Sequence, residues 1–387
     1  MKVPHFRVGD ARIRNKIQAW AEHKRTGLPI SFDLYESAFD AVDWSQEPSL
    51  TWDQLLDLRA HQIAALGRPI VIGYSGGTDS YTIYEVFKRN NIKIAAVFIR
   101  SRLGWEFDVS FRPTLDYMQS ESKAHGFKLH EERENNDWYA SFYDSPDWIW
   151  SDHNLKIQFG NGLQLNPDLD RIAPGLVSSD YVYVNGLDKP RMHIKHGRFW
   201  AYQDQATWSS VSGNERCEPF YMHWRMPELH VKQSYMLARY IMQHALTHDR
   251  PLESYAHIHS PDRHDYYEYC FDGCGRFGEW GYSPTQKLLN NSTKMLLPKN
   301  KDISTALYRG RSQDWFQSGL IRGDGFAMNH VKGLLALRSD PLLSDFDHDL
   351  DLYRGPRISD SKNYELNIDL VDFDHKRQQS KHTAVAL

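Results

Sequence analysis

The stretch that decides the fold is RPIVIGYSGGTDSYTIYEVFKRNNIKIAAVFIR, residues 68–100. Its apolar run at residues 70–73 predicts a short strand covered on both faces, since no polar residue alternates with the apolar ones. A turn rich in glycine and hydroxyl residues follows, and residues 81–89 have the apolar spacing of a helix. Residues 92–99 predict a second buried strand. A strand, a helix and a second strand in this order imply parallel strands joined by a right-handed crossover.

The alternation of strands and helices continues beyond this stretch and indicates the fold class. We predict a helix that Gly126 closes, two further strands and a long amphipathic helix. These elements lie at residues 110–126, 127–134, 180–186 and 228–246. The sequence therefore predicts an α/β protein with a Rossmann-like parallel sheet and flanking helices.

The chain divides into three predicted parts, of which the sheet domain, residues 69–250, is the middle one. Residues 1–68 predict a helical N-terminal layer, with one helix that ends at Gly27 and another that a Ser or Thr caps. Residues 251–387 form a C-terminal region of unknown role with mainly irregular structure. Its polar, alternating end predicts a surface appendage or a partly mobile tail.

The composition excludes several classes of protein. A net charge of −4 over 387 residues argues against a broad surface for duplex DNA, which selects many cations. Three cysteines do not make a disulfide framework. The first residues contain no apolar signal segment, and no apolar run approaches the roughly 20 residues that span a bilayer. We therefore expect a soluble protein of the reducing cytoplasm, without a membrane partner.

The turn after the first predicted strand carries the chemistry. In an open parallel sheet, ligands bind beyond the carboxyl ends of the strands, where this turn lies. Its glycines let backbone N–H groups approach an anion, its hydroxyls add donors, and the following helix directs its positive end there. The pattern is neither a Walker loop nor the dinucleotide fingerprint G-x-G-x-x-G. The residues of the turn are Ser75, Gly76, Gly77, Thr78, Asp79 and Ser80.

This Ser-Gly-Gly-x-Asp-Ser pattern, with a strand before it and a helix after it, resembles the signature of the PP-loop ATP pyrophosphatases. The resemblance covers roughly residues 69–250 and implies a Rossmann-like core of the HUP type. It implies that the loop cradles the β- and γ-phosphates of ATP and that Asp79 helps to hold Mg²⁺. It further implies that an acceptor attacks the α-phosphate, so that ATP is converted to AMP and pyrophosphate.

Other stretches resemble the asparagine synthetase branch of that family. His130 and Glu131 stand where that branch ends a strand in a His-Glu step. In YVYVNGLDKPR, Gly186 and Asp188 match a glycine and an acid near the pyrophosphate, and Asp188 would join Asp79 on the ATP-bound Mg²⁺. Lys189, the candidate catalytic cation for the leaving pyrophosphate, and Arg191 complete the predicted site. The sequence departs here from the branch's Ser-Gly-Glu-Gly-x-Asp-Glu, which leaves the acceptor open.

The resemblance also implies a reaction and a source of nitrogen. It implies adenylylation of a carboxylate or carbonyl, followed by amide or amine formation on a small-molecule or nucleobase acceptor. Residue 2 is Lys rather than the nucleophilic cysteine of a glutaminase domain, so nitrogen would come from ammonia, a substrate amine or a separate donor protein. The added regions suggest a divergent member of the kind that phage genomes carry.

Two alternatives remain open at this point. The first is sulfur transfer or modification of a nucleobase or tRNA on the same core. Cys270 and Cys274, with histidines nearby, would then carry sulfur or hold zinc, although a single C-x-x-x-C is a weak signal for a metal site. The second alternative is a module that binds ATP without turning it over.

Overall fold

A computed structural model of the chain describes residues 5–13, 16–76, 78–101, 112–133, 175–178, 180–186, 190–202, 216–247, 339, 341–342, 362–368, 370 and 373. Its main feature is a five-stranded, entirely parallel sheet with the strand order β10-β7-β4-β5-β6. The strands are β4 (Ile70–Gly73), β5 (Ala96–Ser101), β6 (Lys128–Arg133), β7 (Val182–Asn185) and β10 (Cys217–Pro219). The predicted α/β class with a parallel sheet is confirmed.

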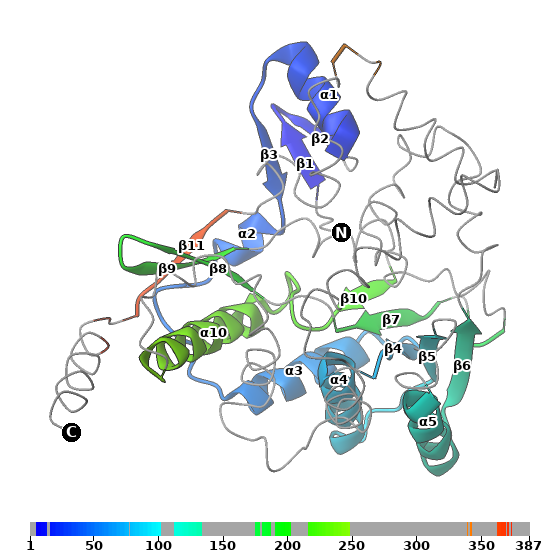
Figure 1. Ribbon diagram of the computed structural model, residues 1–387. Helices are drawn as coiled ribbons and strands as arrows, with labels where there is room; N and C mark the ends of the chain where they lie inside the picture. Colours follow the sequence, from blue (N-terminus) through cyan, green and yellow to red (C-terminus); the bar gives the residue numbers. More distant parts are fainter. Residues whose placement is uncertain are drawn as a thin grey trace, which may run out of the picture.

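Both faces of the central strands β4 and β7 are buried, as their continuous apolar runs predicted. Alternate residues of β4 enter different cores: Ile70 and Ile72 join the large core, and Val71 joins a smaller cluster on the opposite face. Figure 1 shows the helices of the large core on one side of the sheet. They are α3 (Trp52–Ala64), α4 (Thr78–Arg89) and α5 (Arg112–His125), and α10 (Pro227–Thr247) packs against α3.

Local signals explain where these helices begin and end. Thr51 caps α3 through a capping box, in which its hydroxyl accepts from the Gln54 N–H and the Gln54 side chain accepts from the Thr51 N–H. Gly67 follows the helix with a φ of 68°, a left-handed conformation that favours glycine. Gly126 follows α5 with a φ of 73°. These predicted helix ends are therefore confirmed.

The predicted N-terminal layer contains its two expected helices, but it also contains a sheet that the prediction missed. Residues 5–33 contain a three-stranded antiparallel sheet and one helix. We call these elements together the N-terminal module. Its elements are β1 (His5–Val8), β2 (Ala11–Ile13), α1 (Lys16–Thr26) and β3 (Ile30–Asp33), and a short helix α2 (Glu36–Phe39) follows. Ile13, which has the spacing of the helix, ends β2 instead, because a two-residue Gly-Asp turn pairs Val8 with Ala11.

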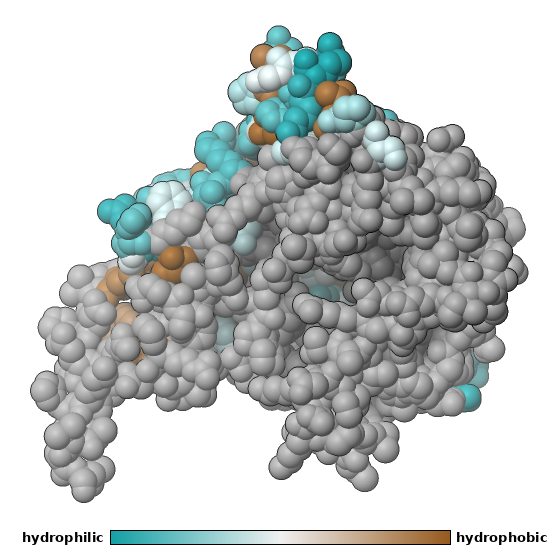
Figure 2. Space-filling model, turned by 45° about the horizontal axis from the view of Figure 1, so that its top comes forward, coloured by the Kyte–Doolittle hydropathy of each residue, from teal (hydrophilic) through white to brown (hydrophobic). Residues whose placement is uncertain are grey.

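The N-terminal module buries its own apolar residues. Phe6, Val8 and Phe32 are all at most 2% exposed, and they join the core of the rest of the protein. In Figure 1 the module stands at the top, away from the parallel sheet. Figure 2 shows that its visible surface is mainly hydrophilic with isolated hydrophobic residues, and Leu28 is an exposed example at 45%. Such single exposed apolar residues are normal for a protein surface.

The prediction that the end of the chain is a surface appendage or mobile tail was wrong for the residues described there. β11 (Tyr364–Leu366) pairs with β9 (Arg198–Tyr202), which forms a hairpin with β8 (Arg191–Lys195). The Tyr364 ring stacks on Trp44 with 4.3 Å between centroids. Leu366 and Phe373 are each 2% exposed. The alternating pattern of YELNIDL is therefore that of a half-buried strand and its continuation.

Candidate functional site

The strand order places the 75–80 loop after the central strand, where the chain switches from adding strands on one side of the sheet to adding them on the other. From the central strand β4 the chain first adds β5 and β6 on one side, and then β7 and β10 on the other. The strands that follow β4 and β7 in the chain are therefore added in opposite directions, and in sheets of this kind a crevice is expected at the carboxyl ends of two such neighbouring strands. The loop follows β4 directly, and Gly186 follows β7. Two separate parts of the predicted site thus meet at this crevice.

The described part of the loop is a tight turn that holds its hydroxyl residues together. The Ser75 N–H donates to Ser80 Oγ at 3.1 Å, and the two Oγ atoms lie 3.2 Å apart. Gly76 has a φ of 78°, which favours glycine at this position. Ser80 is buried, whereas Ser75 is exposed. The turn therefore leaves Ser75 exposed at the surface, while the contact with the buried Ser80 fixes the position of its hydroxyl.

Helix α4 begins at Thr78, so its N-terminus lies at the end of this turn. The unpaired N–H groups of a helix N-terminus favour an anion. Asp79, in the first turn, is half-buried. Its carboxylate would suit a cation bound together with that anion. Hydroxyl groups and a helix N-terminus are groups that can bind a phosphate.

Gly186 packs directly against the start of α4. A Cβ atom at this position would lie 3.0 Å from Ile83 Cδ1, 3.1 Å from Asp79 Cβ and 3.2 Å from the Asp79 carbonyl carbon. From the other side, the fully buried Tyr221 donates its hydroxyl to the Asp79 backbone oxygen at 2.9 Å. Asp79 is thus held between the end of β7 and the segment after β10.

We expect Gly186→Ala to displace the N-terminus of α4 by a few tenths of an ångström, because the new methyl group contacts helix backbone. The cost should be about 1–3 kcal/mol of folding free energy, as is typical of overpacking. Urea unfolding measures this cost. Gly27→Ala, in open space but at a φ of 69°, is the control for backbone strain alone. A Gly186→Ala variant as stable as the wild type would contradict the close packing.

The remaining predicted site residues lie partly inside and partly outside the described ranges. Gly77, Asp188, Lys189, Cys270 and Cys274 lie outside the described residues, so their roles stay predictions. Thr78 is the first residue of α4, and Arg191 is the first residue of β8, where it pairs with Tyr202. No group of three or more His, Cys, Asp or Glu side chains within the described ranges is arranged to hold a metal ion.

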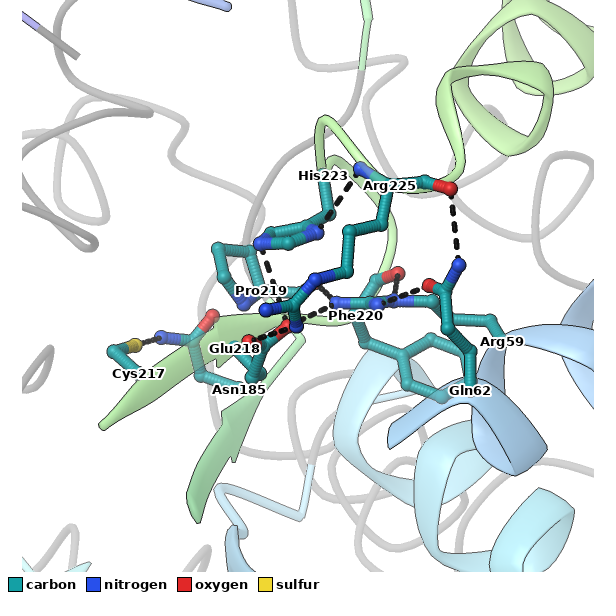
Figure 3. Close-up of polar contacts among 9 residues, drawn as sticks. All are labelled: Arg59, Gln62, Asn185, Cys217, Glu218, Pro219, Phe220, His223 and Arg225. Atoms are coloured by element: carbon teal, nitrogen blue, oxygen red, sulfur yellow. Dashed lines mark hydrogen bonds and ion pairs between the residues drawn. The ribbon is translucent and has the colours of Figure 1, made fainter. Parts of the chain in front are cut away.

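A buried charged cluster lies beside the crevice, and the sequence did not indicate it. Arg59 of α3 is 0% exposed, and its Nη2 lies 2.9 Å from Glu218 Oε2 of β10. The same guanidinium donates to the carbonyl oxygens of Pro219 and Phe220 and to Gln62 Oε1. Figure 3 shows how these groups converge on the carboxyl end of β10. Arg59 and Glu218 are 159 positions apart, which explains why no local pattern reveals the pair.

Two more residues complete the cluster. Arg225 Nη1 lies 2.7 Å from Glu218 Oε1, and His223 Nε2 lies 3.3 Å from Glu218 Oε2. Burial lowers the pKa of His223 well below its usual value, and the charges of Arg59 and Arg225 lower it further. The neutral ring accepts from the Arg225 backbone N–H at Nδ1, so its proton is on Nε2 and faces Glu218. The cluster therefore fixes the backbone of Pro219 and Phe220. The next residue, Tyr221, is the one whose hydroxyl donates to Asp79.

Asn185, the last residue of β7, is a further polar group at the crevice that the sequence analysis missed. Its side-chain Nδ2 donates to the buried Cys217 Sγ at 3.2 Å. The residue is 5% exposed, and its Oδ1 is buried without a hydrogen-bond partner. Its position between the apolar Val184 and Gly186 carries no motif.

Comparison with known proteins adds no assignment to this geometry. No protein-family model matches the chain, and no curated protein sequence matches it. None of the helices in the described ranges combines the length and the apolar character needed to cross a bilayer.

Proposed function

We propose that this protein is a PP-loop ATP pyrophosphatase that activates an acceptor by transferring the AMP group of ATP to it. The observation that supports the proposal is the 75–80 loop, which lies at the carboxyl end of the central strand β4 and leads into the N-terminus of α4. The position of the signature supports the proposal, because sheets of this kind commonly bind phosphate groups at the carboxyl ends of their strands and at helix N-termini.

The described residues of the loop would each have a separate role in binding the triphosphate. Ser75 and the backbone around Gly76 would donate to the β- and γ-phosphates, and Ser80 would hold Ser75 in position. Asp79 would help to hold Mg²⁺, which supplies positive charge for the pyrophosphate as it leaves. Asp188 is the proposed second carboxylate, and Lys189 and Arg191 are the proposed cations for the leaving group.

The proposed reaction begins when a carboxylate or carbonyl oxygen of the acceptor attacks the α-phosphorus. The bond between that phosphorus and the oxygen bridging to the β-phosphate breaks, and its electron pair leaves with pyrophosphate. An amine or ammonia then displaces AMP to form an amide or amine. The proposal assigns to this chain the binding of ATP and the stabilisation of the charge on the leaving pyrophosphate.

We expect Asp79→Asn to lower acceptor-dependent formation of AMP and pyrophosphate about 100- to 1,000-fold, because a ligand of the charge-neutralising cation is lost. The assay measures both products with ammonia as the nitrogen donor and a panel of acceptors. Asp53→Asn is a matched control, since Asp53 also lies in the first turn of a helix, α3. Titration with Mg²⁺ and α,β-methylene-ATP measures binding separately.

Two results would count against the proposal in different ways. If the wild type does not bind the ATP analogue, the loop is not a nucleotide site. If it binds the analogue but no acceptor yields AMP, a module that holds ATP without turning it over explains the loop better.

A further inference from the structure

Asn185 lies next to the proposed ATP site without belonging to the 75–80 loop. It ends β7, which pairs with β4 in the sheet, and the following residue, Gly186, packs against Asp79. Its backbone oxygen accepts from the Phe220 N–H at 3.0 Å, which ties it to the segment after β10. The backbone at Asn185 is therefore held from two sides, next to the residue that contacts Asp79.

Of the two polar atoms of the Asn185 side-chain amide, only the nitrogen has a hydrogen-bond partner. Figure 3 shows the amide nitrogen turned toward Cys217, where it donates to Sγ at 3.2 Å. The oxygen, Oδ1, is removed from water and accepts no hydrogen bond. Leaving such an acceptor unpaired costs folding free energy, so native proteins keep it only where something else requires it.

Comparison with two other amides shows what distinguishes Asn185. The amide nitrogen of the partly buried Asn90 donates both to Asp57 Oδ1 at 2.6 Å and to the Val86 oxygen at 2.8 Å. Gln233 on α10 is fully buried with both amide atoms unpaired, but it lies on a helix that packs against α3 and β8. Asn185 instead ends a central strand beside the 75–80 loop. Unsatisfied groups at such an edge are candidates for binding a ligand.

We propose that Asn185 Oδ1 accepts a hydrogen bond from the acceptor substrate, and that the acceptor is therefore an amide or lactam rather than a carboxylate. The inference depends on the proposed function, in which either type of oxygen could attack ATP. An amide or lactam carries an N–H donor next to its carbonyl oxygen. A carboxylate has no donor at neutral pH, and its charge would face the lone pairs of Oδ1.

The hydrogen bond would also favour the reaction itself. As the lactam oxygen forms its bond to the α-phosphorus and pyrophosphate leaves, the lactam nitrogen becomes more positive and its N–H more acidic. That proton is then lost to water. A hydrogen bond from this N–H to Oδ1 is stronger in the transition state than in the bound substrate, and so it accelerates the step. Asn185 would act as a specificity residue that contacts the substrate directly.

Stability provides the first arm of the test. Asn185→Leu keeps the branching of the side chain and its number of heavy atoms, and removes the unpaired oxygen. We expect its urea midpoint without ligands to equal or exceed that of the wild type, as for Gln233→Leu. Asn90→Leu, which loses two hydrogen bonds, should unfold at lower urea. If Asn185→Leu is destabilised as much as Asn90→Leu, its oxygen has a structural role and the inference fails.

Binding of small probes provides the second arm. With Mg²⁺ and α,β-methylene-ATP bound, 2-pyrrolidinone and butyrate offer a lactam and a carboxylate of similar size, and ligand-observed NMR measures both affinities. We expect the wild type and Gln233→Leu to bind the lactam at least tenfold more tightly. We expect Asn185→Leu to lose this preference.

The inference is overturned if the wild type prefers butyrate, binds neither probe, or keeps its preference in Asn185→Leu. Binding of the nucleotide analogue should be the same in the wild type and Asn185→Leu. This binding separates the two proposals, because failure of the wild type to bind the analogue removes the proposed function, whereas the probe results bear on the acceptor alone.

Discussion

Replacing Arg59 with Met is expected to lower the free energy of unfolding by about 3–5 kcal/mol, the usual cost of removing one partner from a buried ion pair. Glu218, whose side chain is 8% exposed, would lose its fully buried cationic partner. The oxygens of Pro219 and Phe220 would lose their guanidinium donor at the same time. Urea unfolding followed by circular dichroism measures the change.

Arg198→Met is the matched control for this prediction. Arg198 forms an ion pair with Glu365, but its side chain is 64% exposed. Its replacement should therefore cost at most about 1 kcal/mol. Adding Glu218→Leu to Arg59→Met should recover part of the loss, because the buried carboxylate, left with the partly exposed Arg225 as its cation, is then gone. Equal effects of Arg59→Met and Arg198→Met would show that the cluster does not stabilise the fold.

The Arg59 cluster has a consequence for the proposed site as well. It holds the backbone at Pro219 and Phe220, and the next residue, Tyr221, donates to the Asp79 oxygen. A weakened cluster should therefore reduce binding of the ATP analogue even where the protein is still folded. Titration below the unfolding transition tests this link.

Acid is expected to destabilise the protein through His230, which lies on α10. Its ring is enclosed by Phe39 and Trp44, at centroid distances of 5.5 and 6.0 Å, and is 2% exposed together with its backbone. Burial lowers the pKa of His230 to about 3. In the unfolded chain a histidine takes up its proton near pH 6.5.

The direction of the effect follows from these two values. Between about pH 6.5 and pH 3 the unfolded state binds one proton more than the folded state, so stability falls as the pH falls. The loss is about 1.4 kcal/mol for each pH unit below about 6.5, which amounts to about 3 kcal/mol near pH 4. Above pH 6.5 the ring is neutral in both states and contributes no pH dependence.

Urea unfolding at a series of pH values measures the slope in the wild type and in His230→Phe, which keeps an aromatic ring in the same enclosure. Between about pH 6.5 and pH 3, the unfolded state of the wild type should bind more protons than its folded state. In the variant this difference in bound protons should be smaller by about one. The slope that remains should include His223, whose pKa is also lowered by burial. Identical slopes in the wild type and His230→Phe would refute the assignment.

Much of the parallel sheet could be predicted because its signals are local. Four of its five strands and the helices between them follow from apolar runs and helical spacing within about 20 residues. The three-residue strand β10 is too short to produce a pattern. In the N-terminal module, the helical spacing of Ile13 competed with the Gly-Asp turn signal, and the turn determined the structure. A local prediction fails where two local signals disagree.

In the candidate site, too, the features that depend on neighbouring residues could be predicted, whereas the contacts between distant residues could not. The 75–80 loop was predictable because glycine conformation, hydroxyl donors and a helix start depend on neighbouring residues. Its contact with Gly186 was suggested only by the family resemblance, and the structure brings Gly186 against Asp79. The Arg59 cluster and the unpaired oxygen of Asn185 had no signal in the sequence.

The amino-acid sequence by itself determined the fold class of this protein and the position of its glycine-rich loop. Both depend on interactions between residues a few positions apart, which a linear pattern records. Only the tertiary structure decided which polar groups surround that loop and which of them are satisfied. Burial and hydrogen bonding there depend on residues more than 100 positions apart, such as Asp79 and Tyr221, and only the folded chain brings these together.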